Sequence, residues 1–304
     1  MYGVVTRNEE ELDWPEFDRG FYEVKDVTGR ASEPTASGVN TISCFADNAA
    51  AEGDPSLVPL SESGERATRE RPYFDWSHVC PSREAYRRGL LETIEDCADA
   101  SPDVRLDDVG FPRGEYCHCA ACEEAFAESD HEAREDWRAA TVTAFVAEAA
   151  DRVPGRLSLA VHPDPYPGHL RERSGIDVEA VAPHVEEFVV PLYDTAYGTT
   201  YWLEALASGF ADRIAAAGGE AATSDGGDGH AGGGDSGTED GGVDLGVELY
   251  AVNIDVADLL EATDVAEAYA DAVYFGYDSG TARAALRQRR AEAREGKSFG
   301  EPGQ

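Results

Sequence analysis

The sequence predicts an α/β fold, a TIM-type (β/α)8 barrel, on three observations. Short apolar segments rich in β-forming residues recur along the chain, and helical patterns lie between most of the later ones. The length of 304 residues suits one barrel-sized domain. Strands that alternate with helices form βαβ units, and these build a parallel sheet.

Seven segments have the continuous apolar character of parallel strands that are covered on both faces. They are Tyr2–Thr6, Val39–Ala46, Val104–Val109, Leu157–His162, Phe188–Tyr193, Leu245–Val252 and Ala272–Tyr277. A closed barrel of this type needs one more strand. We therefore expect either a further strand within Phe21–Val27 or a barrel that is incomplete at its N-terminus.

Four longer segments carry apolar residues at helical spacing. They are Ser82–Ala100, Arg134–Arg152, Thr199–Ala217 and Val256–Ala270. We expect one barrel domain over residues 1–296 and a flexible tail over 297–304. Within the domain, residues 218–242 are rich in Gly and Asp and almost free of large apolar residues, which predicts a disordered insertion.

The charge of the chain restricts its partners and its medium. Asp and Glu number 61 against 25 Lys and Arg, a formal net charge of −36, and Lys25 and Lys297 are the two lysines. This excess disfavours nucleic acid and anionic membranes as partners. It suits a protein dissolved in concentrated salt, because the salt screens the repulsion between the acidic side chains. Because we find no leader pattern and no apolar stretch of roughly 20 residues, we expect a cytoplasmic protein.

Four cysteines have the spacing of a metal site. Cys117, Cys119 and Cys122 lie within six residues, and Cys80 precedes them by one helix and one strand. Four thiolates form a closed tetrahedral site for structural Zn²⁺, and a reducing cytoplasm favours metal over disulfides. His118 in place of Cys80, or a redox pair of cysteines, are the alternatives.

The segment around these cysteines resembles a known family. Cys80-Pro81, a helix, a strand and Cys-x-Cys-x-x-Cys are similar to the zinc cluster of family 42 β-galactosidases, and the continuation to Phe126 resembles uncharacterised glycosyl-hydrolase-like barrels. The resemblance covers roughly residues 40–130 and implies a barrel with a zinc cluster. The Asn-Glu pair that ends strand 4 in family 42 is missing, so β-galactosidase activity is not implied. Arg105-Leu106-Asp107 instead resembles the Arg-x-Asp strand end of the α-amylase superfamily, in which the Asp is the nucleophile.

Polar side chains at the predicted carboxyl ends of the strands, where parallel barrels hold their active sites, are the candidates for chemistry. The catalytic candidates are Asp107, Asp108, Asp164, Asp194 and Glu248, and the candidates for substrate binding are Arg105, Arg113, His162 and Tyr193. Asp107 is the strongest, because Arg105 lies on the same side of the strand and is expected to lower the pKa of its carboxyl. In so acidic a chain such residues also arise as helix caps, and Asp194 and Asp278 are placed to be caps.

These residues predict a glycoside hydrolase-like enzyme that acts on an oligosaccharide or a small glycoside through two carboxylates. One alternative is a barrel that binds carbohydrate without cleaving it. The other is a metal-dependent barrel hydrolase, in which His162 and the aspartates would hold the metal.

Overall fold

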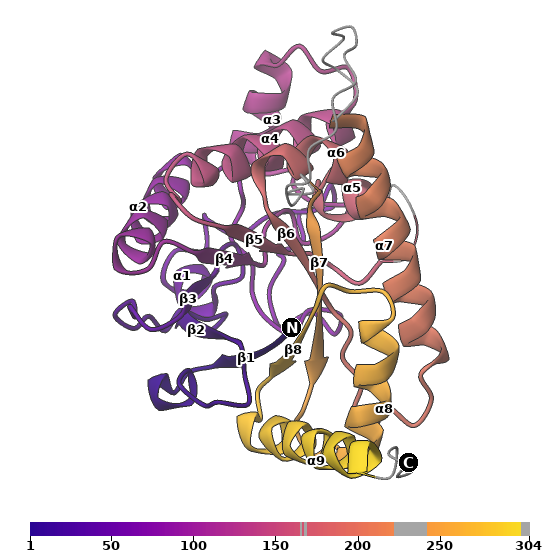
Figure 1. The fold of residues 1–304 in the computed structure, drawn as a ribbon. Coiled ribbons are helices and arrows are strands. Elements are labelled where there is room, and N and C mark those ends of the chain that lie inside the picture. The colour runs from indigo at the N-terminus through magenta and orange to yellow at the C-terminus, as the bar shows by residue number, and fades with distance from the viewer. Residues whose placement is uncertain (165, 167–168, 222–241, 299–304) are drawn as a thin grey trace, which may run out of the picture.

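A computed structural model of the chain describes residues 1–164, 166, 169–221 and 242–298. Eight parallel strands pair in sequence order, and β8 pairs with β1, so the sheet is a closed barrel (Figure 1). The predicted TIM-type barrel is confirmed. The strands are β1 (Tyr2–Thr6), β2 (Arg19–Lys25), β3 (Val39–Ser43), β4 (Val104–Asp107), β5 (Leu157–Ala160), β6 (Glu187–Pro191), β7 (Asp244–Tyr250) and β8 (Ala272–Gly276).

The eighth strand is β2, in the region that the sequence left open, and the alternative of an incomplete barrel is wrong. Its apolar pattern is weak because polar residues alternate with apolar ones. Arg19 contacts Glu187 of β6 inside the barrel, and the Lys25 ammonium donates to the carbonyl of Ser43 at 2.7 Å. Only a short 3-10 helix, η1 (Glu9–Glu11), lies between β1 and β2 in the described chain, so no helical pattern marked this unit.

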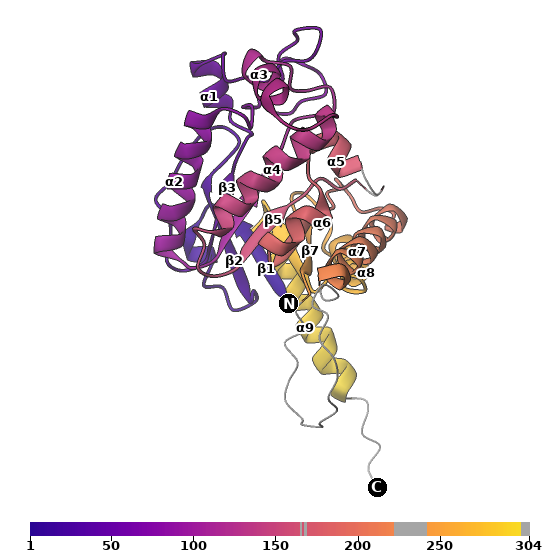
Figure 2. The ribbon, with the colours of Figure 1, turned by 90° about the horizontal axis from the view of Figure 1, so that it is seen from above.

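Long helices surround the barrel, and each of the four predicted segments forms one. Figures 1 and 2 show α2, α4, α7, α8 and α9 around the sheet, with α3 standing off from the ring. The helices are α1 (Asn48–Gly53), α2 (Glu84–Ala100), α3 (Ala120–Glu128), α4 (Arg134–Ala150), α5 (His169–Ser174), α6 (Val178–Val181), η2 (Ala182–His184), α7 (Tyr201–Ala221), α8 (Val256–Glu267) and α9 (Ser279–Ser298). The predicted insertion falls largely on residues 222–241 and the predicted tail on 299–304, both outside the described residues.

The barrel interior combines apolar and charged layers. Phe21, Tyr274 and Val189 belong to one buried apolar cluster. Arg19 with Glu187 and Arg105 with Glu248 are ion pairs whose carboxylates are almost fully buried. Pairing offsets much of the desolvation cost of such charges. No helix in the described part of the chain is long and apolar enough to cross a membrane.

Candidate active site and cysteine cluster

Arg105 on β4 joins two carboxylates that come from different strands. Its Nε lies 2.7 Å from Oδ1 of Asp107, and its Nη2 lies 3.3 Å from Oδ2 of Asp107 and 2.5 Å from Oε2 of Glu248. Glu248 is on β7, so the guanidinium spans the barrel interior from β4 to β7. Arg105 and Glu248 are buried, whereas the Asp107 side chain is 24% exposed. Asp107 is therefore the carboxylate that a ligand can reach.

The shared guanidinium sets an upper limit on the carboxylate spacing. Since one nitrogen contacts both groups, at 3.3 and 2.5 Å, Oδ2 of Asp107 and Oε2 of Glu248 are at most about 6 Å apart. Carboxyl groups about 5–5.5 Å apart serve retaining glycosidases, and those roughly 6.5–9.5 Å apart serve inverting ones. The limit therefore excludes the longer class for the Asp107–Glu248 pair.

The expected lowering of the Asp107 pKa is wrong. Burial raises the pKa of this carboxyl to about 7, and the neighbouring Glu248 and Asp108 add to the rise, against the opposing effect of Arg105. A single guanidinium shared between two carboxylates does not offset the desolvation of both. Asp107 thus holds its proton over part of the neutral pH range.

Tyrosines cover the other side of Glu248. The Tyr193 hydroxyl donates to Oε1 of Glu248 at 2.5 Å. The rings of Tyr193, Tyr250 and Tyr277 have centroids 5.6 to 5.9 Å apart, and Tyr193 and Tyr277 are partly exposed. Tyr277 has a φ of 73°, a strained conformation for an aromatic residue and one that is typical of functional sites.

Gly276, the last residue of β8, leaves room for Glu248. A Cβ atom at this position would lie 2.7 Å from Oε1 of Glu248. A larger residue here would therefore force the Glu248 carboxylate to move from its contacts with Arg105 and Tyr193. An alanine at position 276 would displace Glu248 or Tyr193.

Asp108 has partners of its own. Its backbone has a φ of 54°, and Ser43 Oγ donates to its Oδ2 at 2.7 Å. Burial raises the pKa of this carboxyl too, while Ser43 and Lys25 oppose the rise. Lys25 also contacts Asp47 at 3.1 Å. Asp108 therefore belongs to a network between β2 and β3, whereas Asp107 contacts Arg105.

The remaining candidates lie elsewhere around the barrel mouth. His162 and Asp164, which follow β5, line a cavity of about 300 Å³ whose lining includes neither Asp107 nor Glu248. Arg113 stacks on Tyr73 and contacts Glu115 at 3.3 Å. Asp194 accepts hydrogen bonds from the amides of Thr195 and Ala196, as a turn residue does. Asp278 accepts from the amide of Thr281 and caps α9, as expected.

Sequence reasoning missed Lys25, Tyr250 and His78 as neighbours of the site. Burial and the nearby His162 lower the pKa of His78 to about 3, so its imidazole is neutral. Lys25 was overlooked because β2 remained one of two alternatives. The scarcity of lysine was the available sequence signal, because one of the two lysines in the chain lies in the barrel, where it contacts Asp47.

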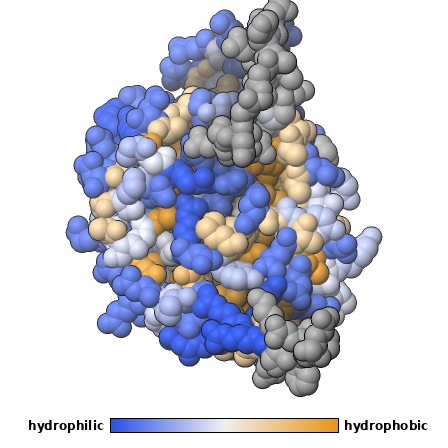
Figure 3. Space-filling view, viewed as in Figure 1, coloured by the Kyte–Doolittle hydropathy of each residue, from blue (hydrophilic) through white to orange (hydrophobic). Residues whose placement is uncertain are grey.

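Figure 3 shows the molecular face in the view of Figure 1. Hydrophilic residues form most of its outer rim, and hydrophobic residues show between them nearer the centre. Hydrophilic side chains thus predominate on the rim of this face, as expected for a solvated surface.

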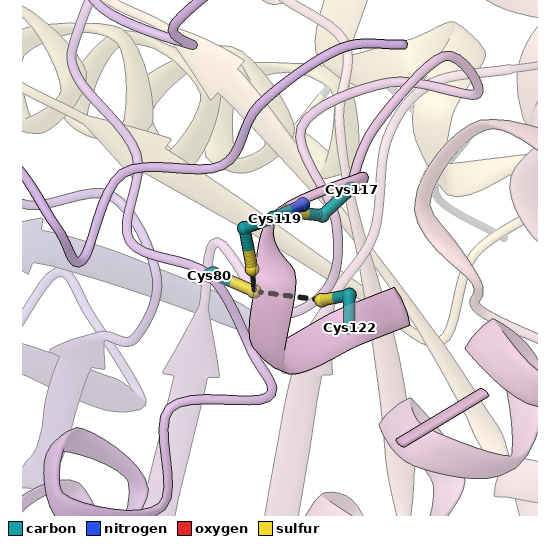
Figure 4. A group of neighbouring side chains, drawn as sticks. All are labelled: Cys80, Cys117, Cys119 and Cys122. Carbon is teal, nitrogen blue, oxygen red and sulfur yellow. Dashed lines mark hydrogen bonds between the residues drawn. The ribbon is translucent and has the colours of Figure 1, made fainter. Parts of the chain in front are cut away.

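The four predicted cysteines come together beside the barrel (Figure 4). All are buried, and their sulfur atoms lie within 4.8 Å of one another. Sγ of Cys80 is 3.3 Å from that of Cys122 and 3.9 Å from that of Cys119. Cys80 comes from the segment before α2, and the others come from the start of α3 and the residues before it.

This cluster fits a tetrahedral metal ion. With Zn–S bonds of about 2.3 Å, the sulfurs of a tetrahedral site lie roughly 3.8 Å apart, close to the spacing found. The amides of Leu60 and Cys119 each donate to Sγ of Cys117 at 3.3 Å, which is how outer-shell groups stabilise thiolate ligands. Interactions with the other three cysteines lower the pKa of Cys119.

His118 is not part of the cluster. Its Nδ1 contacts Oε1 of Glu123 at 2.9 Å, and Cys80 occupies the fourth position. Within the described residues, the cysteines are the one group of three or more His, Cys, Asp and Glu side chains close enough to hold a metal ion. His162 and the aspartates therefore form no such group there.

Comparison with known proteins gives the fold but no sequence family. No protein-family model matches the chain, and no curated protein matches it in sequence. Isoenzyme 2 of α-L-fucosidase from Paenibacillus thiaminolyticus superposes with a TM-score of 0.62 at 11% identity, over 96% of this chain and 46% of its own. A β-galactosidase from Rahnella sp. R3 gives a TM-score of 0.53 at 11% identity, over 91% of this chain and 50% of its own.

The chain thus has the barrel fold of glycoside hydrolases and spans about half the length of these two enzymes. At such identities the likeness establishes the fold alone.

Proposed function

We propose that the protein is a glycoside hydrolase-like enzyme whose two working carboxylates are Asp107 and Glu248. The observation that carries this proposal is the Arg105 guanidinium, which contacts both carboxylates, at 2.7 and 2.5 Å. It holds groups from β4 and β7 within about 6 Å at the end of the barrel where such sites lie.

The two carboxylates have different environments and hence different roles. Asp107 is partly exposed and its pKa is raised to about 7, which suits a general acid and base near neutral pH. Glu248 accepts hydrogen bonds from Arg105 and Tyr193, which hold its carboxylate in place and suit the role of the nucleophile. In this proposal Asp107 carries the proton, in place of the nucleophilic role expected from the Arg-x-Asp resemblance.

The structural neighbours support a carbohydrate as the substrate. Both enzymes are named for the glycosides that they cleave, an α-L-fucoside and a β-galactoside. Because the likeness is one of fold, the sugar of this protein is left to experiment.

A screen of chromogenic glycosides tests the proposal, with wild type, Asp107→Asn and Glu248→Gln compared side by side in molar KCl. We expect turnover in the wild type and its loss in both variants, with folding and metal content unchanged. Azide separates the roles when the side chains are shortened. In Asp107→Ala azide, which needs no general base, displaces Glu248 from the glycosyl-enzyme, whereas in Glu248→Ala it attacks the substrate directly and the aglycone leaves, so the two variants give glycosyl azides of opposite anomeric configuration. Full activity in either variant would remove that residue from the mechanism.

A carbohydrate-binding barrel without catalysis is the second candidate. The burial of Glu248 favours it, because Arg105 occupies one carboxylate oxygen and Tyr193 the other. Sugars that raise the melting temperature, with no glycoside cleaved by the wild type, would identify this function.

We further propose that the cysteine cluster holds one structural Zn²⁺. With four thiolates the ion would have no open position for substrate, so its contribution would be to tie the segment before α2 to the start of α3. We also propose that the acidic surface serves solubility in concentrated salt within the cytoplasm.

A further inference from the structure

Arg173 on α5 has a partly buried side chain. Its Nε atom is buried and has no hydrogen-bond partner among the described residues. Arg171, two positions earlier, contacts the carboxylates of Glu135, Asp136 and Asp177. A buried guanidinium nitrogen without a partner, on a side chain that lines a cavity, is a candidate to bind a ligand there.

Arg173 lies in the wall of the cavity that follows β5. This cavity, of about 300 Å³, is lined by Arg173, His162, Asp164, His169, Pro163 and Tyr166. Its size is at the lower end of small-molecule sites, which run from about 300 to 1,000 Å³. It can hold one sugar unit at the same end of the barrel as Asp107.

Asp164, the one carboxylate among the residues that line this wall, is engaged through one of its two oxygens. Asp164 Oδ1 lies 3.0 Å from Nδ1 of His169 and accepts from the amide of Tyr166 at 3.3 Å. Asp164 and the more distant Glu115 act on Arg173 through charge, and Arg113 adds a second positive charge nearby. Burial lowers the pKa of His162 to about 4, so its neutral imidazole can donate one hydrogen bond and accept another.

We infer that this cavity binds the carboxylate of an acidic sugar, a hexuronate, with Arg173 as its main ligand. A guanidinium pairs with a carboxylate through two parallel hydrogen bonds. The exposed ring of Tyr166, whose centroid is 5.1 Å from that of His169, offers an apolar face for the sugar ring. This inference rests on the proposed function, since it names the class of sugar that the enzyme accepts.

Calorimetric binding of free sugars to the full-length, zinc-loaded protein tests it. D-glucuronate and D-galacturonate are compared with D-glucose and D-galactose, which have the same rings without the carboxylate. We expect the uronates to bind at least about 10-fold more tightly, and Arg173→Gln to weaken uronate binding about 10- to 100-fold with little effect on the neutral sugars. Arg88→Gln, which removes the same charge from an exposed site on α2, should change neither.

Arg173→Lys is the control for misfolding, because it keeps the positive charge and should keep part of the preference for uronates. Equal binding of uronates and hexoses by the wild type, no binding of either, or uronate binding unaffected by Arg173→Gln would each overturn the inference. If the protein cleaves neutral glycosides in a way that depends on Asp107 but shows no preference for uronates, the proposed function holds and this inference fails. If uronate binding depends on Arg173 but no glycoside is cleaved, the binding site holds and the proposed enzymatic function fails.

Discussion

Replacing Asp107 with Asn should stabilise the protein at alkaline pH while it abolishes activity. The folded state holds this carboxyl at a pKa of about 7, against 3.8 for the unperturbed group. A raised carboxyl pKa means that the folded state binds the proton more tightly than the unfolded chain does. The stabilisation from the protonated group is therefore present at low pH and is lost as the pH rises towards about 7.

The size of the effect follows from the two pKa values. One pKa unit corresponds to about 1.4 kcal/mol, so between pH 5 and pH 8 the ionisation of Asp107 costs the wild type about 3 kcal/mol. Asn has nearly the same volume and does not titrate. The difference in Tm, variant minus wild type, should therefore grow by roughly 5–10 °C from pH 5 to pH 8.

Thermal unfolding of both proteins at pH 5, 6, 7 and 8, in the same molar KCl, measures this difference. Titrating groups that do not interact with Asp107, such as His78 and His162, contribute equally to both proteins and cancel. A difference in Tm that stays constant across this range would refute the raised pKa. A pKa lowered by Arg105 would give this constant difference, because the carboxyl would then be ionised in both the folded and the unfolded state above about pH 5.

Three further predictions follow from the same structure. If Asp107 is the general acid, kcat/KM should fall as the pH rises through about 7, since only the protonated carboxyl can donate; a pH–rate profile shows this, and a rate unchanged up to pH 9 would contradict it. Cys80→Ser should lower zinc from one ion per chain, measured by elemental analysis, whereas Cys97→Ser, at a buried cysteine outside the cluster, should leave it unchanged. With a net charge of −36, the Tm should fall between 2 M and 0.1 M KCl, because the Debye length grows to about 10 Å at the lower salt; a Tm independent of salt would exclude dependence of the fold on salt.

The fold was predictable wherever strands are apolar and helices are periodic. Seven strands and four long helices were found in this way, and β2 remained one of two alternatives because Arg19, Glu23 and Lys25 interrupt its apolar pattern. Those residues are polar because they line a charged barrel interior, which local patterns do not reveal. The cysteine cluster was predictable because three of its members lie in one turn of chain.

The candidate site was predictable in its members but not in its pairing. Asp107, Arg105, Glu248 and Tyr193 were all among the candidates, yet so were Asp164 and Asp194, and only tertiary contacts separate the two groups. The direction of the Asp107 pKa depends on the same contacts. The spacing of Arg105 and Asp107 in the sequence reveals one ion pair, whereas the second carboxylate that shares the guanidinium lies 143 positions away.

The shared guanidinium connects stability with function in this barrel. One positive charge faces two carboxylates, so full ionisation leaves a buried site with an uncompensated negative charge. A protein selected for stability alone would replace Asp107 or Glu248 with a neutral residue and pair Arg105 with the carboxylate that remains. Retention of both, next to Tyr277 in a strained backbone conformation, is the pattern expected where a site gives up stability to keep a proton available near neutral pH.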